Sequence, residues 1–187
     1  MSVVTIRPGG LATKDPNDAI VCKSDWGTYS LDNAAATIVS QTYSITVLKA
    51  GSDASLSATI TRSSTTATVT TASAHGYATN NWITIAGASQ PDYNGTVKIT
   101  VLSTTTFTYT VANSPTTPAT GTITSTSGMV ADNPSILSTS PYSSRWTQVR
   151  LLGGTEGASY EVTNNIVTDE TPAQHKDRFF LVAIEDK

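Results

Sequence analysis

Apolar and polar residues alternate along three segments between residues 141 and 187. A period of two places one face of each segment against a core and leaves the other face in water, which indicates β-strands. Gly153-Gly154 separates the first two segments, and a polar arch from Asp169 to Asp177 separates the last two. The pattern predicts an antiparallel meander with one buried face. Its apolar positions are Trp146, Val149 and Leu151; Tyr160, Val162 and Ile166; and Phe180, Val182 and Ile184.

The segment from Thr59 to Thr126 has its own rhythm of short strands, and its only charged residues are Arg62, Asp92 and Lys98. Asn94-Gly95 predicts a type I′ turn, because both residues tolerate a positive φ. Strands this short and evenly spaced predict a small sandwich or barrel. We expect these strands at residues 65–71, 81–87, 96–102, 106–112 and 120–124.

Small, turn-forming residues at 50–58 and 127–135 indicate linkers on both sides of this segment. Upstream of it, strands are expected at 19–24 and 36–48, which are too few for a stable sheet of their own. We therefore predict a discontinuous outer domain, 1–58 with 128–187, and a module inserted in one of its loops, 59–127. The predicted fold class is all-β: an antiparallel sandwich that carries a second small β-sandwich or barrel module.

Composition agrees with a β-protein and limits its partners. Ser and Thr supply roughly three residues in ten, and Thr favours pleated, half-exposed surfaces. Charged residues make up 13%, the net charge is −3, and Arg145 and Arg150 stand apart, so we expect no direct binding of nucleic acid. Cys22 is the single cysteine, so no intrachain disulfide can form. We expect no secretory signal and no membrane-spanning helix, because no apolar run in the sequence has the length that either needs.

No motif points to catalysis, a cofactor or a metal. His75 and His175 fall in different predicted domains, whereas zinc needs three or four close ligands, and His75-Gly76 is typical of a turn. No Gly-x-Ser-x-Gly elbow or Gly-rich phosphate loop occurs. The carboxylates at 15–32 and 161–170 are interpreted as solvated loop charges, since acid–base catalysis also needs a shaped cleft. A calcium site at Asp15, Asn17 and Asp18 is conceivable but lacks the twelve-residue loop pattern. We expect a protein that is not an enzyme and has no cofactor.

Aromatic residues have two interpretations. Trp26, Trp82, Tyr93 and Trp146 could form a platform on which a sugar stacks, but such residues more often fill cores or anchor interfaces. Core positions are expected for Trp82 and Trp146, which lie on alternating strands. Tyr93 lies in a turn and is expected to be an exposed contact residue.

The segment from Met1 to Asp18 is expected to be an arm that contacts a partner. Pro8-Gly9-Gly10 and Pro16 are expected to prevent regular structure, yet the arm carries apolar residues that would gain burial by docking on a neighbour. Val4 and Ile6 alternate and could add a strand to a neighbour's sheet. Removal of residues 1–12 is then expected to leave a folded monomer that fails to assemble. The candidate contact residues are Val3, Val4, Ile6, Leu11 and Tyr93.

Both parts of the outer domain carry distinctive motifs. They are Lys14-Asp15-Pro16, Ser24-Asp25-Trp26, Ala36-Thr37-Ile38-Val39-Ser40, the strand from Trp146 to Leu152, Gly153-Gly154-Thr155, Tyr160-Glu161-Val162-Thr163-Asn164 and Arg178-Phe179-Phe180. Through these motifs the outer domain resembles the phage fibre–tail adaptor family of tailed-phage virion proteins. The sequence departs from the family at Phe179, where a small polar residue is usual, and around Tyr29, where a second Trp is common.

The inner segment is similar to a module that recurs in phage structural proteins. Its markers are Ala74-His75-Gly76, Ile83-x-Ile85-x-Gly87-Ala88, Tyr93-Asn94-Gly95 and Phe107-x-Tyr109. Because the module occurs in several kinds of virion protein, it implies a phage particle more strongly than any one position in that particle.

The resemblance implies an Ig-like, non-enzymatic structural protein of the virion, assembled in the host cytoplasm. It implies an adaptor at the neck or head–tail junction, or between tail and fibres, that acts through protein–protein contacts in a homo-oligomeric ring. The implied partners are portal or connector, tail tube and tail fibre proteins. The alternative is a carbohydrate- or receptor-binding decoration module on the virion surface, which an exposed stripe of aromatic residues on one sheet face would favour.

Overall fold

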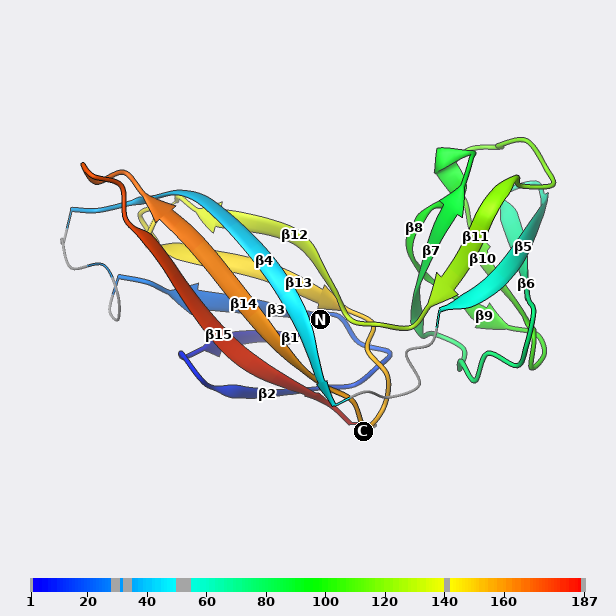
Figure 1. The fold of residues 1–187 in the computed structure, drawn as a ribbon, viewed down its shortest axis with the longest axis horizontal. Helices are drawn as coiled ribbons and strands as arrows, with labels where there is room; N and C mark the ends of the chain where they lie inside the picture. The colour runs from blue at the N-terminus through cyan, green and yellow to red at the C-terminus, as the bar shows by residue number, and fades with distance from the viewer. Residues whose placement is uncertain (1, 28–30, 32–34, 50–54, 140–141, 186–187) are drawn as a thin grey trace. The chain divides into compact units, whose positions relative to one another are not determined.

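The computed structural model describes residues 2–27, 31, 35–49, 55–139 and 142–185. Within these residues the chain is built of strands, apart from one short 3-10 turn at Pro91–Tyr93. The prediction of an all-β fold is confirmed. The chain divides into two compact units (Figure 1). The first unit comprises Met1–Gly51, Met129–Leu152 and Glu156–Lys187, and the second comprises Ser52–Gly128 and Gly153–Thr155.

One sheet of the first unit has four strands in the order β1-β3-β13-β12. β1 runs parallel to β3, and the other neighbours are antiparallel. Side chains alternate between the inside and the outside, as Ile20, Cys22 and Ser24 show by their burial on β3. The bounds are β1 Ser2–Ile6, β3 Ile20–Asp25, β13 Trp146–Leu152 and β12 Val130–Leu137.

The other sheet of the first unit also has four strands, in the order β2-β15-β14-β4. β2 runs parallel to β15, and the other pairs are antiparallel. The bounds are β2 Leu11–Lys14, β15 His175–Ile184, β14 Ser159–Thr168 and β4 Ile38–Lys49.

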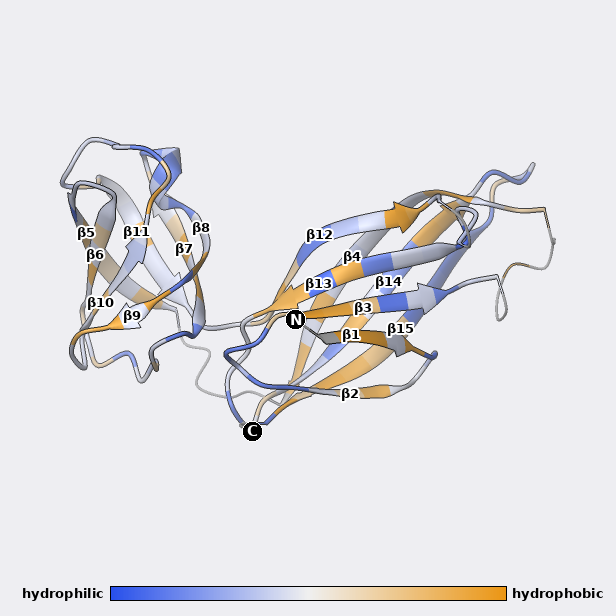
Figure 2. Ribbon diagram, turned by 180° about the vertical axis from the view of Figure 1, so that it is seen from behind, coloured by the Kyte–Doolittle hydropathy of each residue, from blue (hydrophilic) through white to orange (hydrophobic). Residues whose placement is uncertain are grey.

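The two sheets enclose one hydrophobic core, so the first unit is a sandwich. Figure 2 shows apolar and polar residues interleaved along its strands. The main core takes side chains from both sheets, including Val149 and Leu151 from one and Tyr160, Phe180 and Val182 from the other. A smaller cluster surrounds the fully buried Trp26 and includes Leu31, Ala36, Ile38 and Ile166.

The predicted three-stranded meander is wrong in one pairing. β14 and β15 pair over their length, joined by the polar arch, as predicted. β13 pairs with β3 and β12 instead, so β13 and β14 lie in opposite sheets. Gly153 and Gly154, with φ of 70° and 98°, lie where the chain leaves β13 for the other sheet. Alternation shows that a strand has one buried face, but both sheets of a sandwich meet that condition equally.

The expectation that prolines and glycines keep the N-terminal segment irregular is also wrong, because β1 and β2 are strands of the sandwich. Pro8-Gly9-Gly10 is the short connection by which the chain passes from one sheet to the other. Gly9 has a φ of 69°, and its N–H donates a hydrogen bond to the Phe179 carbonyl at 2.9 Å. These residues therefore end one strand and start the next.

The second unit holds one seven-stranded sheet in the order β8-β7-β11-β5-β6-β10-β9. The outermost strands, β8 and β9, are consecutive in the chain with only Ile99 between them, so the sheet curls into a nearly closed barrel (Figure 1). Its core includes Ile60, Val69, Ile85, Phe107 and Ile123. The bounds are β5 Leu56–Ser63, β6 Thr66–Thr71, β7 Trp82–Ala88, β8 Gly95–Lys98, β9 Thr100–Val101, β10 Thr106–Thr110 and β11 Gly121–Thr126.

The linker predictions are wrong where they overlap strands. β5 begins at Leu56, within the predicted linker 50–58, and β12 begins at Val130, within 127–135. β12 contains Pro134 and a positive φ at Asn133, and its pairing with β13 shifts there. Such residues are typical of a turn. An edge strand tolerates them because backbone groups on its unpaired side form no hydrogen bonds with another strand.

Candidate interaction surfaces

Of the predicted contact residues in the N-terminal segment, the structure exposes two and wholly or partly buries the other two. Val3 and Leu11 are 59% and 66% exposed. Val4 is half-buried against the main core, and Ile6 is buried within it. The strand that was expected to join a neighbour's sheet thus pairs with β3 of its own chain. Because Ile6 belongs to the core, removing residues 1–12 is now expected to destabilise the sandwich.

Tyr93 is fully buried, so its expected role as an exposed contact is wrong. The turn before Asn94 is the 3-10 turn rather than type I′, since Asn94 is extended with φ −82° and ψ 147°. The Asn94 side chain accepts from Ala88 N–H at 3.0 Å and donates to its carbonyl at 2.8 Å. This clamp directs Tyr93 inward, where its hydroxyl donates to the Thr116 carbonyl at 3.1 Å. The hydroxyl of Tyr109 donates to the Tyr93 carbonyl at 2.8 Å.

The tryptophans also differ from expectation. Trp82 and Trp146, expected in the core, are half-buried. Trp26 is the fully buried one: its indole N–H donates to Thr147 Oγ1 at 2.9 Å, and the Arg178 guanidinium lies 4.5 Å from its ring centroid. In the second unit every aromatic side chain is buried or half-buried, so none forms an exposed stripe; these are Tyr77, Trp82, Tyr93, Phe107 and Tyr109.

The outward side of the β1-β3-β13-β12 sheet is hollowed, and we call it the first face. The hollow measures about 290 Å³. Its residues combine apolar, cationic and amide side chains. They are Val3, Val21, Lys23, Asn133, Gln148 and Arg150.

Aromatic side chains border the first face beside its cations. Tyr142 and Trp146 meet edge to face, with centroids 5.4 Å apart. Lys23 Nζ donates to the Tyr142 hydroxyl at 3.0 Å and lies 4.8 Å from the centroid of that ring. Arg150 forms an ion pair with Asp132. Within the described part of the chain, no carboxylate forms an ion pair with Lys23.

The outward side of the β2-β15-β14-β4 sheet, which we call the second face, carries an apolar cluster. Leu11 lies opposite Leu181 in the pairing of β2 with β15, and Phe179 is 45% exposed two residues earlier on β15. Glu161 lies opposite Leu181 on β14, and Asp177 precedes Phe179 by two residues. The second face thus has an apolar centre with carboxylates beside it.

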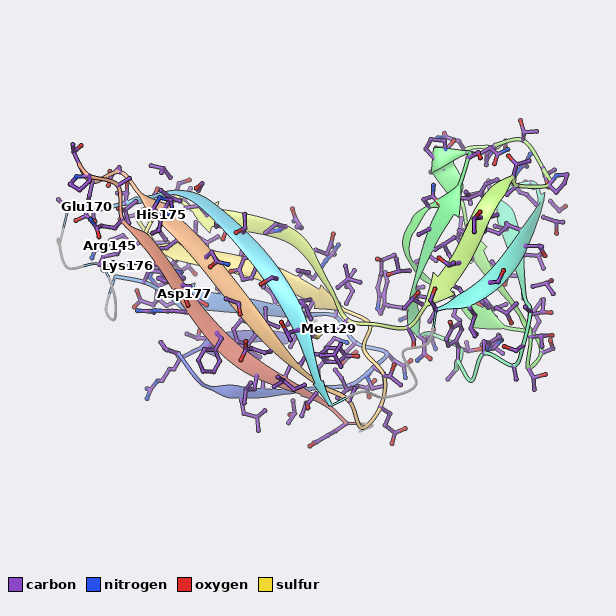
Figure 3. All side chains as sticks on the ribbon, in the orientation of Figure 1. Met129, Arg145, Glu170, His175, Lys176 and Asp177 are labelled. Carbon is purple, nitrogen blue, oxygen red and sulfur yellow. The ribbon has the colours of Figure 1, made fainter. Side chains whose placement is uncertain are left out.

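Titratable residues gather where β15 begins (Figure 3). His175, Lys176 and Asp177 start the strand, and Arg145 and Glu170 lie toward the same end of the first unit. A shallow hollow there is lined by hydroxyl, amide and charged side chains, among them Ser40, Thr42 and Asn165. Among the described residues no group of three or more His, Cys, Asp or Glu is placed to hold a metal ion.

Hydrogen bonds between residues 14 and 18 form a turn at Asp15. The Asp15 carboxylate accepts from the Asn17 N–H at 2.7 Å, and the Asp15 carbonyl accepts from Asp18 N–H at 3.1 Å and from Lys14 Nζ at 2.9 Å. Burial lowers the pKa of Lys14 to about 8. The carboxylate that was considered as a calcium ligand therefore makes a turn.

Two further reactive side chains are buried. Burial raises the pKa of the Cys22 thiol to about 12, which keeps it protonated and unreactive. His75 accepts the Tyr77 N–H at 2.9 Å through Nδ1, and its ring stacks on Tyr77 with centroids 4.7 Å apart. His75 was expected only to lie in a turn, but its ring is buried and packs against Tyr77. Burial lowers the pKa of His75, so it is neutral at pH 7.

The described part of the chain contains no helix long and apolar enough to cross a membrane. The sequence matches no model of a protein family, and no curated protein matches it. The link to the phage fibre–tail adaptor family therefore stays a proposal that rests on the motifs given above.

Sequence reasoning missed several residues of these faces, chiefly Lys23, Tyr142 and Leu181. A usable signal exists for Val21 and Leu181. Each is apolar at a position that alternation assigns to the solvent side of its strand, beside the buried Cys22 and Val182. An apolar residue on the polar side of an amphipathic strand indicates a contact surface.

Proposed function

We propose that this chain is a non-enzymatic structural protein of a tailed-phage virion. It serves as an adaptor at the neck or head–tail junction, or between tail and fibres, within a ring of copies. The virion assignment is supported by the sequence motifs of both units. Its partners are other virion proteins, namely portal or connector, tail tube or tail fibre proteins.

The observation that carries a role in protein contact is the pair of outward faces of the sandwich. Exposed Val3 on one face and exposed Leu11 and Phe179 on the other stand beside charged and aromatic side chains. Trp, Tyr and Arg dominate the energetics of protein interfaces, and Tyr142, Trp146 and Arg150 border or line the first face. Two such faces suit an adaptor, which must hold more than one neighbour.

The alternative role in carbohydrate or receptor binding has less support. Stacking on a sugar needs accessible aromatic faces, and the inserted module buries or half-buries all of its aromatic side chains. A glycan array probed with the full chain addresses this alternative. Binding of a glycan at micromolar concentration, lost on substitution in the second unit, would favour it over the adaptor role.

The direct test is the composition of purified particles of the phage that encodes this chain. We expect the chain in stoichiometric amount, located at the neck or tail by electron microscopy with an epitope tag in the Ser103–Thr105 turn. A phage that lacks the gene is expected to yield heads and tails that do not join, or particles without fibres. Normal, infectious particles without the chain would overturn the proposal.

A further inference from the structure

We propose that the first face of one copy of this chain binds the second face of the next copy, so that copies assemble head to tail. The inference deepens the proposed function and rests on it for the choice of a second copy as the partner. Four lines of observation lead to it: apolar fit, charge, the placement of the faces and their size.

Each face presents exposed or half-buried apolar side chains that the other face would bury. The first face has a hollow of about 290 Å³ with Val3 and Val21 in its lining. The second face projects Phe179 and Leu11, which are 45% and 66% exposed. Phe179 in this hollow would pack against Val3 and Val21, and aromatic side chains that become buried in this way are common anchors of protein interfaces.

The first face carries one cation, and the second face two carboxylates, that form no ion pair among the described residues; the first face also holds the Arg150–Asp132 ion pair and Asp25. Lys23 in the first face donates to a tyrosine hydroxyl and forms no ion pair with a described carboxylate. Among the described residues, Glu161 and Asp177 on the second face form no ion pair with a cation, and Glu161 accepts a long hydrogen bond of 3.5 Å from Thr163 Oγ1. Both carboxylates adjoin the apolar cluster, as Lys23 adjoins the hollow. Docking would thus pair charges that have no ion-pair partner among the described residues of one chain.

The same charges disfavour contact of a face with its own copy. Two first faces would bring their Lys23 cations together, and two second faces would bring their carboxylates together. Like charges across an interface reduce the binding affinity and therefore disfavour that arrangement. The favoured contact is therefore heterologous, with different surfaces from the two copies.

The placement of the faces allows the contact to repeat. The two sheets lie back to back around one core, so the faces point away from each other and each copy can hold two neighbours. A heterologous contact that repeats gives a ring when its rotation closes. The exposed apolar clusters are small, so one contact is weak and closure of the ring supplies the additional stability.

The first experiment couples carboxylates to amines with a zero-length carbodiimide reagent on the full chain, at concentrations up to about 1 mM, where contacts of millimolar affinity are populated. Lys23 and Glu161 project from opposite faces of one sandwich, so a link between them forms only between copies. We expect a ladder of dimers, trimers and larger species, and Lys23–Glu161 or Lys23–Asp177 peptides by mass spectrometry.

The second experiment exchanges the charges. Lys23→Glu and Glu161→Lys should each weaken self-association about fivefold, as expected for a partly exposed ion pair, and the double variant should regain most of it. Lys98→Glu, an exposed lysine of the second unit, is the matched control and should change nothing. Sedimentation velocity measures the association, and circular dichroism checks that each variant is folded.

The outcomes separate this inference from the proposed function. A monomer at about 1 mM, links that omit Lys23, or a double variant as weak as the single ones would overturn the head-to-tail contact. So would another virion protein seated on either face in purified particles. If the chain is found in particles without Lys23–Glu161 or Lys23–Asp177 links, only this inference fails. If the chain is missing from particles, the proposed function fails whatever its self-association.

Discussion

Gly87 offers a sharp test of the structure of the second unit. It lies on β7 with a φ of +82°, and a Cβ at this position would lie 1.9 Å from the Thr122 carbonyl oxygen on β11. Gly121 faces it with a φ of +110°, and its added Cβ would lie 2.2 Å from the Gly87 carbonyl oxygen. The two strands therefore approach so closely here that neither position accepts a side chain. Gly76 has a similar φ of +67° but has no atom within 4 Å of its added Cβ.

The magnitude of Gly87→Ala follows from two additive parts. A left-handed backbone costs an alanine about 1–2 kcal/mol, partly offset by about 0.4–1 kcal/mol from the lower entropy of the unfolded chain. Gly76→Ala carries only this part. Gly87→Ala must also push the β11 backbone away by more than 1 Å, because a carbon–oxygen contact needs about 3 Å. Overpacking of this kind costs about 1–3 kcal/mol or more, so we expect Gly87→Ala to exceed Gly76→Ala by at least about 1 kcal/mol.

Hydrogen exchange read by mass spectrometry measures the effect in the full chain. Peptides that cover β7 and β11 should exchange much faster in Gly87→Ala than in Gly76→Ala. Peptides from the first unit, such as those of β14 and β15, serve as an internal reference and should not change. Equal loss of protection in the two variants, within about 0.5 kcal/mol, would refute the close approach of these strands.

Other predictions concern the N-terminal strand, the buried histidine and the inserted unit. Ile6→Ala should lower the free energy of unfolding by about 2–4 kcal/mol because it empties a core position, whereas Val3→Ala on the same strand should cost less than about 0.5 kcal/mol in chemical denaturation; equal effects would argue against β1 as part of the sandwich. Because burial lowers the pKa of His75 in the folded state, the unfolded chain binds more protons below the usual value of 6.5. The free energy of unfolding of the second unit should therefore be highest above that pH and should fall as the pH drops through 6.5. His75→Gln should flatten this pH dependence in thermal melts from pH 7.5 to about 4.5. An unchanged slope in the variant would contradict a role of His75 in this dependence. Replacement of Ser52–Gly128 by a short Gly-Ser linker should leave the first unit folded, since the deletion ends outside β4 and β12; loss of its tertiary signal by NMR would show that the units fold as one.

Local alternation in the sequence determined where most strands lie. Val69 on β6, Val149 on β13 and Val162 on β14 are each flanked by polar residues, and all three strands occur where that pattern places them. The all-β fold and the departure of the chain into a second unit between β4 and β12 also follow from sequence, because charge and small residues change abruptly there. These features depend on neighbours along the chain, so the sequence displays them directly.

The tertiary structure decided which strands pair and which side chains remain exposed. Alternation could not assign β13 and β14 to opposite sheets, because either sheet would bury the same face of each strand. Local turn chemistry placed Tyr93 in solvent, but its hydroxyl meets the carbonyl of Thr116, which no local pattern encodes. β1 forms because β3, about twenty residues later, offers a parallel partner that outweighs the breaks at Pro8 and Gly9. Pairing and burial arise from contacts between distant segments, and so the two faces that we propose to bind each other became visible only in the folded chain.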